Sequence, residues 1–296
     1  MLMKKRKLLG LILSVVMVVA MLGGCGGASN DKTSSGDGGS GDGKKDLITI
    51  GFSQVGAESD WRTANTESMK STFTAENGYR LIFDDAQQKQ ENQLKAIRNF
   101  IQQEVDYIVL APVTESGWDA VLKEAKDADI PVIIVDRMVD VSDDSLYTAW
   151  VGSNFKLEGQ KACAWLKAYQ DAQKLDKINI VDIQGTIGAS AQIGRTEALN
   201  EAVKANGWNL LAQQTGEFTQ AKGQEVMESM LKQYKDINVV YCENDNEAFG
   251  AIDAIEAAGK TVGPDGDILV MSFDTTKAGI TDTQSGKIIL NTECNP

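Results

Sequence analysis

The sequence predicts an α/β protein with two similar lobes, each a doubly wound parallel sheet, joined by a hinge. Short apolar runs alternate with amphipathic stretches from about residue 47 onward. One of these runs, Ile130–Arg137 (IPVIIVDR), has four consecutive β-branched residues and no polar alternation, which is typical of a strand buried inside a parallel sheet. The alternation begins a second time after residue 151, so we expect two sheets rather than one.

Residues 1–24 have the pattern of a secretory signal. Four cations, Lys4 to Lys7, precede the apolar run Leu8–Met21, which is short for a membrane span. The segment ends in Leu-Gly-Gly-Cys at residues 22–25, which resembles the lipobox of bacterial lipoproteins. The resemblance implies that Cys25 carries a diacylglyceryl group and anchors the chain to a membrane without spanning it. A plain secretory cleavage beside an incidental cysteine is the alternative.

Residues 25–46 are expected to form a flexible tether behind that lipid anchor. They are mostly Gly, Ser, Asp and Lys, with no apolar residue beyond Ala28, so they cannot bury a core. The segment Gly38–Lys45 imitates a phosphate-binding loop. The imitation fails because no strand precedes it and Lys45 replaces the Ser or Thr that would hold magnesium.

Composition narrows the possible functions. The chain has 296 residues, 42% of them hydrophobic, which suffices for two domains with their own cores. When the four signal cations are left out, 25 of the 29 basic residues remain against 42 acidic residues, which gives a net charge of −17. A protein with this charge repels nucleic acid. The chain has no histidine, and we predict no metal, no cofactor and no catalysis. Cys163, Cys242 and Cys294 lack C-x-x-C spacing and are expected to be unpaired packing residues.

The first lobe is expected to span residues 47–151, with four strand-helix repeats that start at Leu47. Leu94, Ile97 and Ile101 share one face of an expected helix, and Gly78 is expected to end the helix before it. The predicted strands are Leu47–Gln54, Tyr79–Asp85, Tyr107–Pro112 and Ile130–Arg137, with Ala149–Asn154 carrying the chain onward. The predicted helices are Arg62–Asn77, Lys89–Gln103 and Trp118–Ala128.

The second lobe is expected to span residues 152–292, and residues 293–296 to begin a crossover back to the first lobe. Its predicted strands are Ile178–Gln184, Trp208–Gln213, Asn238–Cys242, Asp267–Asp274 and Lys287–Glu293. Its predicted helices are Phe155–Gln170, Gln192–Asn206, Gln220–Tyr234, Asn246–Ala258 and Thr276–Thr283.

Polar residues follow the strands of both expected sheets. Asp136 and Arg137 end the strand quoted above, and the other strand ends carry Ser, Asp, Gln, Asn and Glu. Ligands of such sheets bind at the carboxyl ends of the strands. Carboxylates, amides and guanidinium forks suit the hydroxyl groups of a sugar, and an aromatic ring suits its C–H face. Caps, turns and a structural ion pair between Asp136 and Arg137 are the alternatives.

Six strings in the sequence are similar to the type I sugar-binding proteins of bacterial ABC importers, the ribose-binding class, and most of all to its galactofuranose-binding members. The likeness covers Leu47–Pro296. The strings are GFSQVGAESDWR (51–62), QQKQENQ (87–93), VLKEAKDADIPV (121–132), QGTIGAS (184–190), KGQEVMES (222–229) and END (243–245).

The resemblance implies a ligand site shared by the two lobes. Ser53, Glu58, Trp61 and Arg62 would line it from the first loop, with Asp136 and Arg137 beside them. The second lobe would contribute Arg195, Phe218, Asn244, Asp274 and Glu293. An aromatic residue such as Phe218 could instead cap a helix, and Glu293 stands where ribose binders have an amide.

The sequence also departs from that class. Members continue with elements that return to the first lobe, whereas this sequence ends at Pro296, so we expect the first lobe to lack its last elements. The segment Gly263–Asp267 is too short to replace the calcium loop of glucose/galactose binders.

The expected function is therefore an extracytoplasmic, lipid-anchored and monomeric receptor. It would capture a monosaccharide, with a galactofuranose-like hexofuranose favoured, by lobe closure and deliver it to an ABC permease. It would face the outside of the cell membrane, or the periplasm where the source has two membranes. A sensor subunit that presents the sugar to a chemoreceptor or histidine-kinase ectodomain is the alternative, and a ribose or pyranose binder is a further one. A glycosidase using Asp136 and Asp274 has no supporting signature, and a transcription regulator of this fold would lack the signal peptide.

Overall fold

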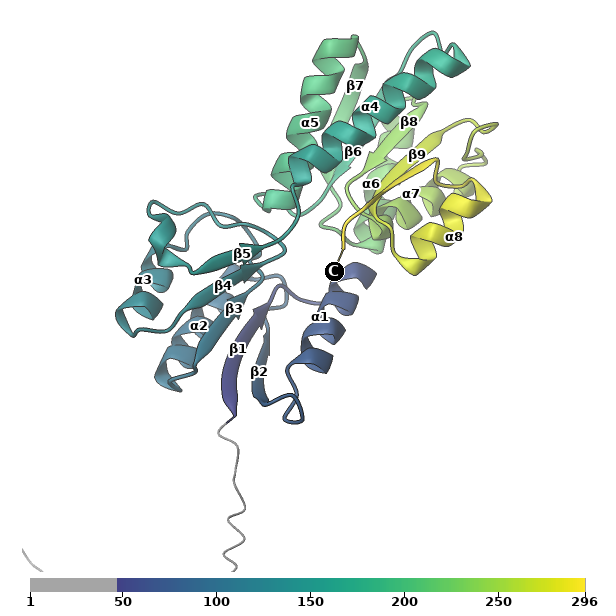
Figure 1. Ribbon diagram of the computed structural model, residues 1–296. Coiled ribbons are helices and arrows are strands. Elements are labelled where there is room, and N and C mark those ends of the chain that lie inside the picture. Colours follow the sequence, from purple (N-terminus) through teal and green to yellow (C-terminus); the bar gives the residue numbers. More distant parts are fainter. Residues whose placement is uncertain (1–46, 296) are drawn as a thin grey trace, which may run out of the picture. The chain divides into compact units, whose positions relative to one another are not determined.

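The computed structural model describes residues 47–295. The expected signal peptide, the expected lipidation site Cys25 and the expected tether lie outside these residues. Within the described part of the chain, no helix is both long enough and apolar enough to cross a membrane. Two five-stranded parallel sheets organise the chain, each covered by helices (Figure 1).

The first sheet has the strand order β2-β1-β3-β4-β5, and every neighbouring pair is parallel. Parallel neighbours need crossover connections, and helices supply three of the four. The strands are β1 (Ile48–Gln54), β2 (Tyr79–Asp85), β3 (Tyr107–Leu110), β4 (Val132–Val135) and β5 (Ala149–Val151). The helices are α1 (Asp60–Thr72), α2 (Gln90–Gln102), α3 (Asp119–Asp127) and the 3₁₀ turn η1 (Asp144–Leu146).

The two faces of the first sheet are covered unequally. Helices α2 and α3 bury one face with a cluster that includes Ile97, Phe100, Trp118 and Leu122. The other face packs against α1 through side chains that stay partly exposed, such as Met69 and Phe73. Strand β4 therefore alternates between buried and half-buried residues. The strand predicted within Ile130–Arg137 is observed as Val132–Val135, inside the parallel sheet as expected, and its second face is half-buried.

Helix α1 is shorter than predicted. It ends at Thr72, and Phe73 leaves the helical conformation with φ −91° and ψ 63°. The ring of Phe73 then packs edge-to-face on Tyr79 at 5.2 Å between centroids. Gly78, with φ +91°, closes the turn before β2 instead of ending the helix.

The second sheet has the order β10-β9-β8-β6-β7 and is also fully parallel. Its strands are β6 (Asn179–Gln184), β7 (Asn209–Thr215), β8 (Val239–Cys242), β9 (Leu269–Asp274) and β10 (Leu290–Glu293). The helices are α4 (Phe155–Gln173), α5 (Ser190–Asn206), α6 (Gln220–Gln233), α7 (Asp245–Ala257) and α8 (Lys277–Ser285).

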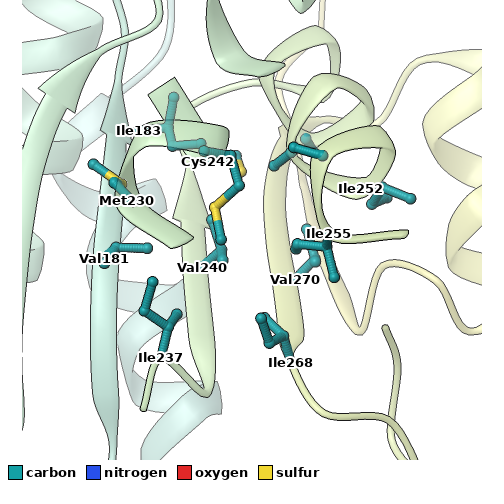
Figure 2. Close-up of a cluster of buried hydrophobic side chains, with 14 of the residues drawn as sticks. Val181, Ile183, Met230, Ile237, Val240, Cys242, Ile252, Ile255, Ile268 and Val270 are labelled. Carbon is teal, nitrogen blue, oxygen red and sulfur yellow. The ribbon is translucent and has the colours of Figure 1, made fainter. Parts of the chain in front are cut away.

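Helices cover both faces of the second sheet, which makes it doubly wound as predicted. Helices α6 and α7 close one face over a core that includes Met230, Val240 and Ile255 (Figure 2). Helices α4 and α5 close the other face, where Cys163 and Leu166 pack. The three described cysteines, Cys163, Cys242 and Cys294, are buried and unpaired, as predicted.

Asp182 on β6 is a buried carboxyl group inside the second lobe. It is fully buried, and its Oδ2 accepts one hydrogen bond from Gln213 Nε2 at 2.9 Å. Burial raises the pKa of Asp182 from 3.8 to about 7, although the bond from Gln213 opposes the rise. The folded state therefore binds this proton more tightly than the unfolded chain does.

We expect the contribution of Asp182 to the free energy of unfolding to fall as the pH rises from about 4 to about 7, because folding then requires a buried charge at this position. The Asp182→Asn variant should gain stability at about pH 8, by an amount on the order of a few kcal/mol, and little at about pH 4. Urea denaturation at both pH values measures this. Equal effects of the substitution at the two pH values would contradict the assignment.

Candidate ligand-binding site

A pocket with a cavity volume of about 20 Å³ lies between the carboxyl ends of the two sheets. This volume holds about one water molecule and is far below the roughly 300–1,000 Å³ of small-molecule sites, so the side chains that line the pocket lie close together. Nine of the eleven predicted site residues line it: Glu58, Trp61, Arg62, Asp136, Arg137, Arg195, Phe218, Asn244 and Asp274. Four further residues complete the lining: Ser59, Phe155, Ala191 and Cys294.

The structure leaves Ser53 and Glu293 outside this lining. Ser53 is fully buried near the end of β1, and its Oγ has no hydrogen-bond partner among the described residues. Glu293 is exposed at the end of edge strand β10, whereas the next residue, Cys294, is buried and lines the pocket. Successive side chains of an extended chain point to opposite sides, so the position that faces the pocket is Cys294 and not Glu293.

Arg62 joins the charged groups of the first lobe. It projects from the first turn of α1, where Ser59 Oγ caps the helix by accepting a hydrogen bond from the Arg62 backbone N–H. Its Nε lies 3.0 Å from Glu58 Oε1, and its Nη2 lies 2.6 Å from Asp136 Oδ2. All three side chains are at least 94% buried. Because buried charges are stable only when paired, Arg62 stabilises both carboxylates at once.

Arg137 does not pair closely with its sequence neighbour Asp136 and instead contacts other residues. Its Nε lies 3.9 Å from Asp136 Oδ2, so the two are only loosely paired. Its Nη1 donates to the backbone oxygen of Val113 at 3.1 Å, and its Nη2 lies 3.5 Å from Glu58 Oε1. The main ion pair of Asp136 is therefore with Arg62 and not with its neighbour Arg137, in contrast to the pair expected from the sequence.

The backbone of Asp136 turns its side chain away from the strand. Its φ is +61°, in the left-handed region that aspartate visits more readily than most residues. The Asp136 N–H donates to Val151 O at 2.9 Å, and Trp150 Nε1 donates to Asp136 O at 3.1 Å. A Cβ at Gly152 would lie 2.1 Å from that same oxygen, so only glycine fits there.

The charges of the first lobe shift one another's pKa values. Burial opposes ionisation of Glu58, but the nearby charges of Arg62 and Arg137 outweigh it and lower the pKa of Glu58. Burial, and then repulsion by Arg62, lower the pKa of Arg137 to about 10. Both groups are therefore charged at neutral pH, and the first lobe presents two guanidinium groups beside two carboxylates.

Arg195 on α5 joins the charged groups of the second lobe, as Arg62 joins those of the first lobe. Its Nη2 lies 2.9 Å from Glu158 Oε2 and 3.6 Å from Asp274 Oδ1, and its Nη1 donates to the backbone oxygen of Glu243. Its guanidinium carbon lies 5.3 Å and 4.6 Å from the ring centroids of Phe155 and Phe273. These contacts hold the guanidinium group in one orientation.

Asp274 is the last residue of β9 and lies at the edge of the pocket. Burial raises its pKa from 3.8 to about 7, and the opposing charge of Arg195 only partly reverses this. A group with this pKa is partly protonated at neutral pH. It can donate a hydrogen bond to a hydroxyl group as well as accept one.

Aromatic rings form the remaining walls. Trp61 Nε1 donates to Cys294 O at 2.6 Å, which joins α1 to the end of β10. Arg62 lies 4.9 Å from the centroid of Trp61, and Arg137 lies 4.9 Å from the centroid of Phe218. Phe218 does not cap a helix, because Thr219 is the N-cap residue of α6.

Hydrogen bonds join the two lobes around the pocket. The Asp60 N–H donates to Asn246 Oδ1 at 3.0 Å, and the Glu115 N–H donates to Gly188 O at 2.8 Å. The Met138 N–H donates to Ser190 Oγ at 2.9 Å. The charged side chains therefore lie in a site with little access to water, where electrostatic interactions are strong.

Two of the additional lining residues had a signal in the sequence. Ser59 is the N-cap residue of α1, and Asn154 caps α4 directly before Phe155. Such caps mark the start of helices at a sheet edge. The apolar Ala191 and the buried Cys294 carried no comparable signal. Among residues 47–295, no cluster of three or more His, Cys, Asp or Glu side chains has an arrangement that could hold a metal ion.

Residues 50–290 match a periplasmic binding protein domain family. The chain is 47% identical to the galactofuranose-binding protein YtfQ of Escherichia coli K12 over 231 residues, which cover 77% of this chain and 71% of that protein.

Two solved structures are also similar. One is a protein from Mycobacterium smegmatis in complex with β-D-fucofuranose, with 47% identity, a TM-score of 0.80, and coverage of 84% of this chain and 81% of the other. The second is the periplasmic binding protein component of the arabinose ABC transporter from Shewanella sp. ANA-3, bound to α- and β-L-arabinofuranose. It shows 45% identity, a TM-score of 0.75 and coverage of 81% and 78%. With its two α/β lobes of parallel strands, the chain belongs to the periplasmic binding protein family, in the type I fold.

Proposed function

We propose that this protein is the extracytoplasmic sugar-binding component of an ABC importer and that its ligand is a furanose, with a hexofuranose such as galactofuranose favoured. Two relatives support the proposal. One is named a galactofuranose-binding protein, and the other is the periplasmic binding protein component of an arabinose ABC transporter. The protein would capture the sugar by lobe closure and would not catalyse a reaction. Cys25 would hold it at the membrane surface through a lipid.

The pocket's combination of groups is the observation that carries the proposal. Three of the five arginines outside the signal segment, Arg62, Arg137 and Arg195, meet there with buried carboxylates from both lobes. Arg62 Nη1 is buried and has no hydrogen-bond partner among the described residues. A sugar hydroxyl group can accept from such a donor while it donates to a neighbouring carboxylate. Trp61 and Phe218 offer rings for the C–H surface of the sugar.

The furanose ring form is proposed from two facts. Two relatives are described as bound to, or named for, six-carbon furanoses, and a third is bound to arabinofuranose. The lining residues are also largely held by one another, as the ion pairs of Arg62 and Arg195 show. A rigid site leaves its own polar groups unpaired when a ring of another shape enters, which costs affinity.

The test is a comparison of methyl galactofuranoside with methyl galactopyranoside, since each is locked in one ring form. We expect the furanoside to bind more tightly, by about two orders of magnitude. Isothermal titration calorimetry measures both affinities, and the fluorescence of Trp61 reports occupancy. Equal affinities, or tighter binding of the pyranoside, would overturn the ring-form proposal, and no binding of either would overturn the site.

Two other functions are separated by simple measurements. Hydrolysis of the methyl furanoside, followed by release of methanol in NMR spectra, would indicate a glycosidase that uses Asp136 and Asp274. We expect none, because Asp136 is held in an ion pair with Arg62. A sensor subunit would use the same closed form, so co-purification of the intact protein with a permease, or with a kinase ectodomain, distinguishes the two partners.

A further inference from the structure

The corner between β7 and α6, which carries Phe218, has an unusual backbone. Glu217 and Phe218 both have positive φ values, +56° and +61°. A bulky residue rarely adopts this left-handed conformation, and each such residue costs free energy that the surrounding structure must offset. Two of them in succession indicate that other groups hold Phe218 in place.

Glu247 supplies the contact that holds this corner. Its Oε1 accepts a hydrogen bond from the Phe218 backbone N–H at 2.8 Å. On the other side of the same residue, Asn244 Nδ2 donates to Phe218 O at 3.0 Å. Asn244 Oδ1 also accepts from the Glu247 N–H at 2.8 Å, as the N-cap of α7. The start of α7 therefore binds both polar backbone groups of Phe218.

Three glycines leave room for this arrangement. A Cβ at Gly216 would lie 2.7 Å from Glu247 Oε1, and one at Gly223 would lie 2.8 Å from Glu247 Cα. A Cβ at Gly185 would lie 1.9 Å from Phe218 Cζ. The carboxyl group of Glu247 and the ring of Phe218 thus fit against backbone that has no side chains.

Glu247 does not line the pocket and forms no ion pair among residues 47–295. It is fully buried, and its Oε2 has no hydrogen-bond partner in the described part of the chain. Burial raises the pKa of Glu247 well above its usual value, although the hydrogen bond from Phe218 opposes this. A neutral carboxyl group in this place acts through its one accepted hydrogen bond, and an amide can accept the same bond.

We propose that Glu247 is a positioning residue that orients the Phe218 ring and thereby sets the ring-form selectivity of the site. The inference rests on the proposed furanose-binding function. Phe218 lies between the Gly185 backbone on one side and Arg137 of the other lobe on the other. A shift of its ring would therefore change both the wall against which the sugar packs and the Arg137 guanidinium above it.

The experiment compares Glu247→Gln with Glu247→Met. The two replacements have similar size, but only glutamine keeps an acceptor for the Phe218 N–H. We expect Glu247→Gln to bind methyl galactofuranoside within about threefold of the parent protein and Glu247→Met to bind it at least about tenfold more weakly. The ratio of furanoside to pyranoside affinity should fall in the methionine variant alone.

A core variant provides the matched control for lost stability. Val240 is fully buried in the apolar cluster of the second lobe and does not line the pocket, so Val240→Ala should destabilise the lobe without changing selectivity. If Val240→Ala lowers the affinity ratio as much as Glu247→Met does, or if Glu247→Gln fails like Glu247→Met while still folding, the proposal is overturned.

A second measurement needs no ligand and so separates this inference from the proposed function. We expect the Phe218 amide proton to be protected from hydrogen exchange in the parent protein and in Glu247→Gln, and to lose that protection in Glu247→Met. Equal protection in all three would overturn the positioning role. If the protection of the Phe218 amide still differs between the variants but the parent protein binds no furanoside, the result would count against the proposed ligand and not against the positioning role.

Discussion

We expect Arg62→Met to lower the free energy of unfolding by about 3–5 kcal/mol and to abolish furanose binding. Arg62 is the buried partner of both Glu58 and Asp136, at 3.0 Å and 2.6 Å. Methionine fills similar space, but it leaves two carboxylates in a site closed to water. Urea denaturation at neutral pH measures the loss.

The control for Arg62 is Arg98→Met. Arg98 pairs with Glu124 on the surface, where both side chains are more than 40% exposed, so its loss should leave the free energy of unfolding close to that of the parent protein. Adding Asp136→Asn to Arg62→Met should recover part of the stability, because it removes one unpaired charge. If the double variant were less stable than Arg62→Met, the central role of this ion pair would be refuted.

Arg137→Lys is expected to weaken furanose binding by more than about tenfold while the protein stays folded. A lysine keeps a positive charge near Glu58, so folding loses little. It cannot reproduce the planar group that donates to Val113 O and lies 4.9 Å from the Phe218 ring centroid. Calorimetric titration with methyl galactofuranoside measures the change.

The pH dependence of this variant gives an independent check. Burial and the charge of Arg62 already lower the pKa of Arg137 to about 10, and a lysine begins from a lower intrinsic pKa, about 10.4. The lysine should therefore lose its proton at a lower pH than an exposed lysine does, and the affinity of the variant should fall further as the pH rises. Arg80→Lys, whose arginine contacts Thr49 outside the pocket, should bind like the parent protein. Unchanged affinity of Arg137→Lys would mean that Arg137 serves folding alone.

The fold was largely predictable because its signals are local. Strands and helices of the second lobe follow from apolar runs and caps, and their observed bounds, such as Asn179–Gln184, differ from those predicted by a few residues. The errors arose where packing decides. The end of α1 depends on the contact between Phe73 and Tyr79, and the half-buried face of β4 depends on what covers it. Neither the contact between Phe73 and Tyr79 nor the covering of β4 can be read from local sequence patterns.

The sequence by itself determined which residue types gather at the carboxyl ends of the strands. The alternation of strands and helices implies that neighbouring strands run in the same direction, so their carboxyl ends meet at one edge of the sheet. The tertiary structure decided how those residues pair. Asp136 has left-handed backbone and is held by Arg62 from α1, rather than by the adjacent Arg137. Cys294 faces the pocket in place of Glu293, since one residue along an extended chain reverses the side-chain direction. The bond from Phe218 to Glu247 joins residues 29 positions apart. Distances between such residues are set only when the whole lobe is folded.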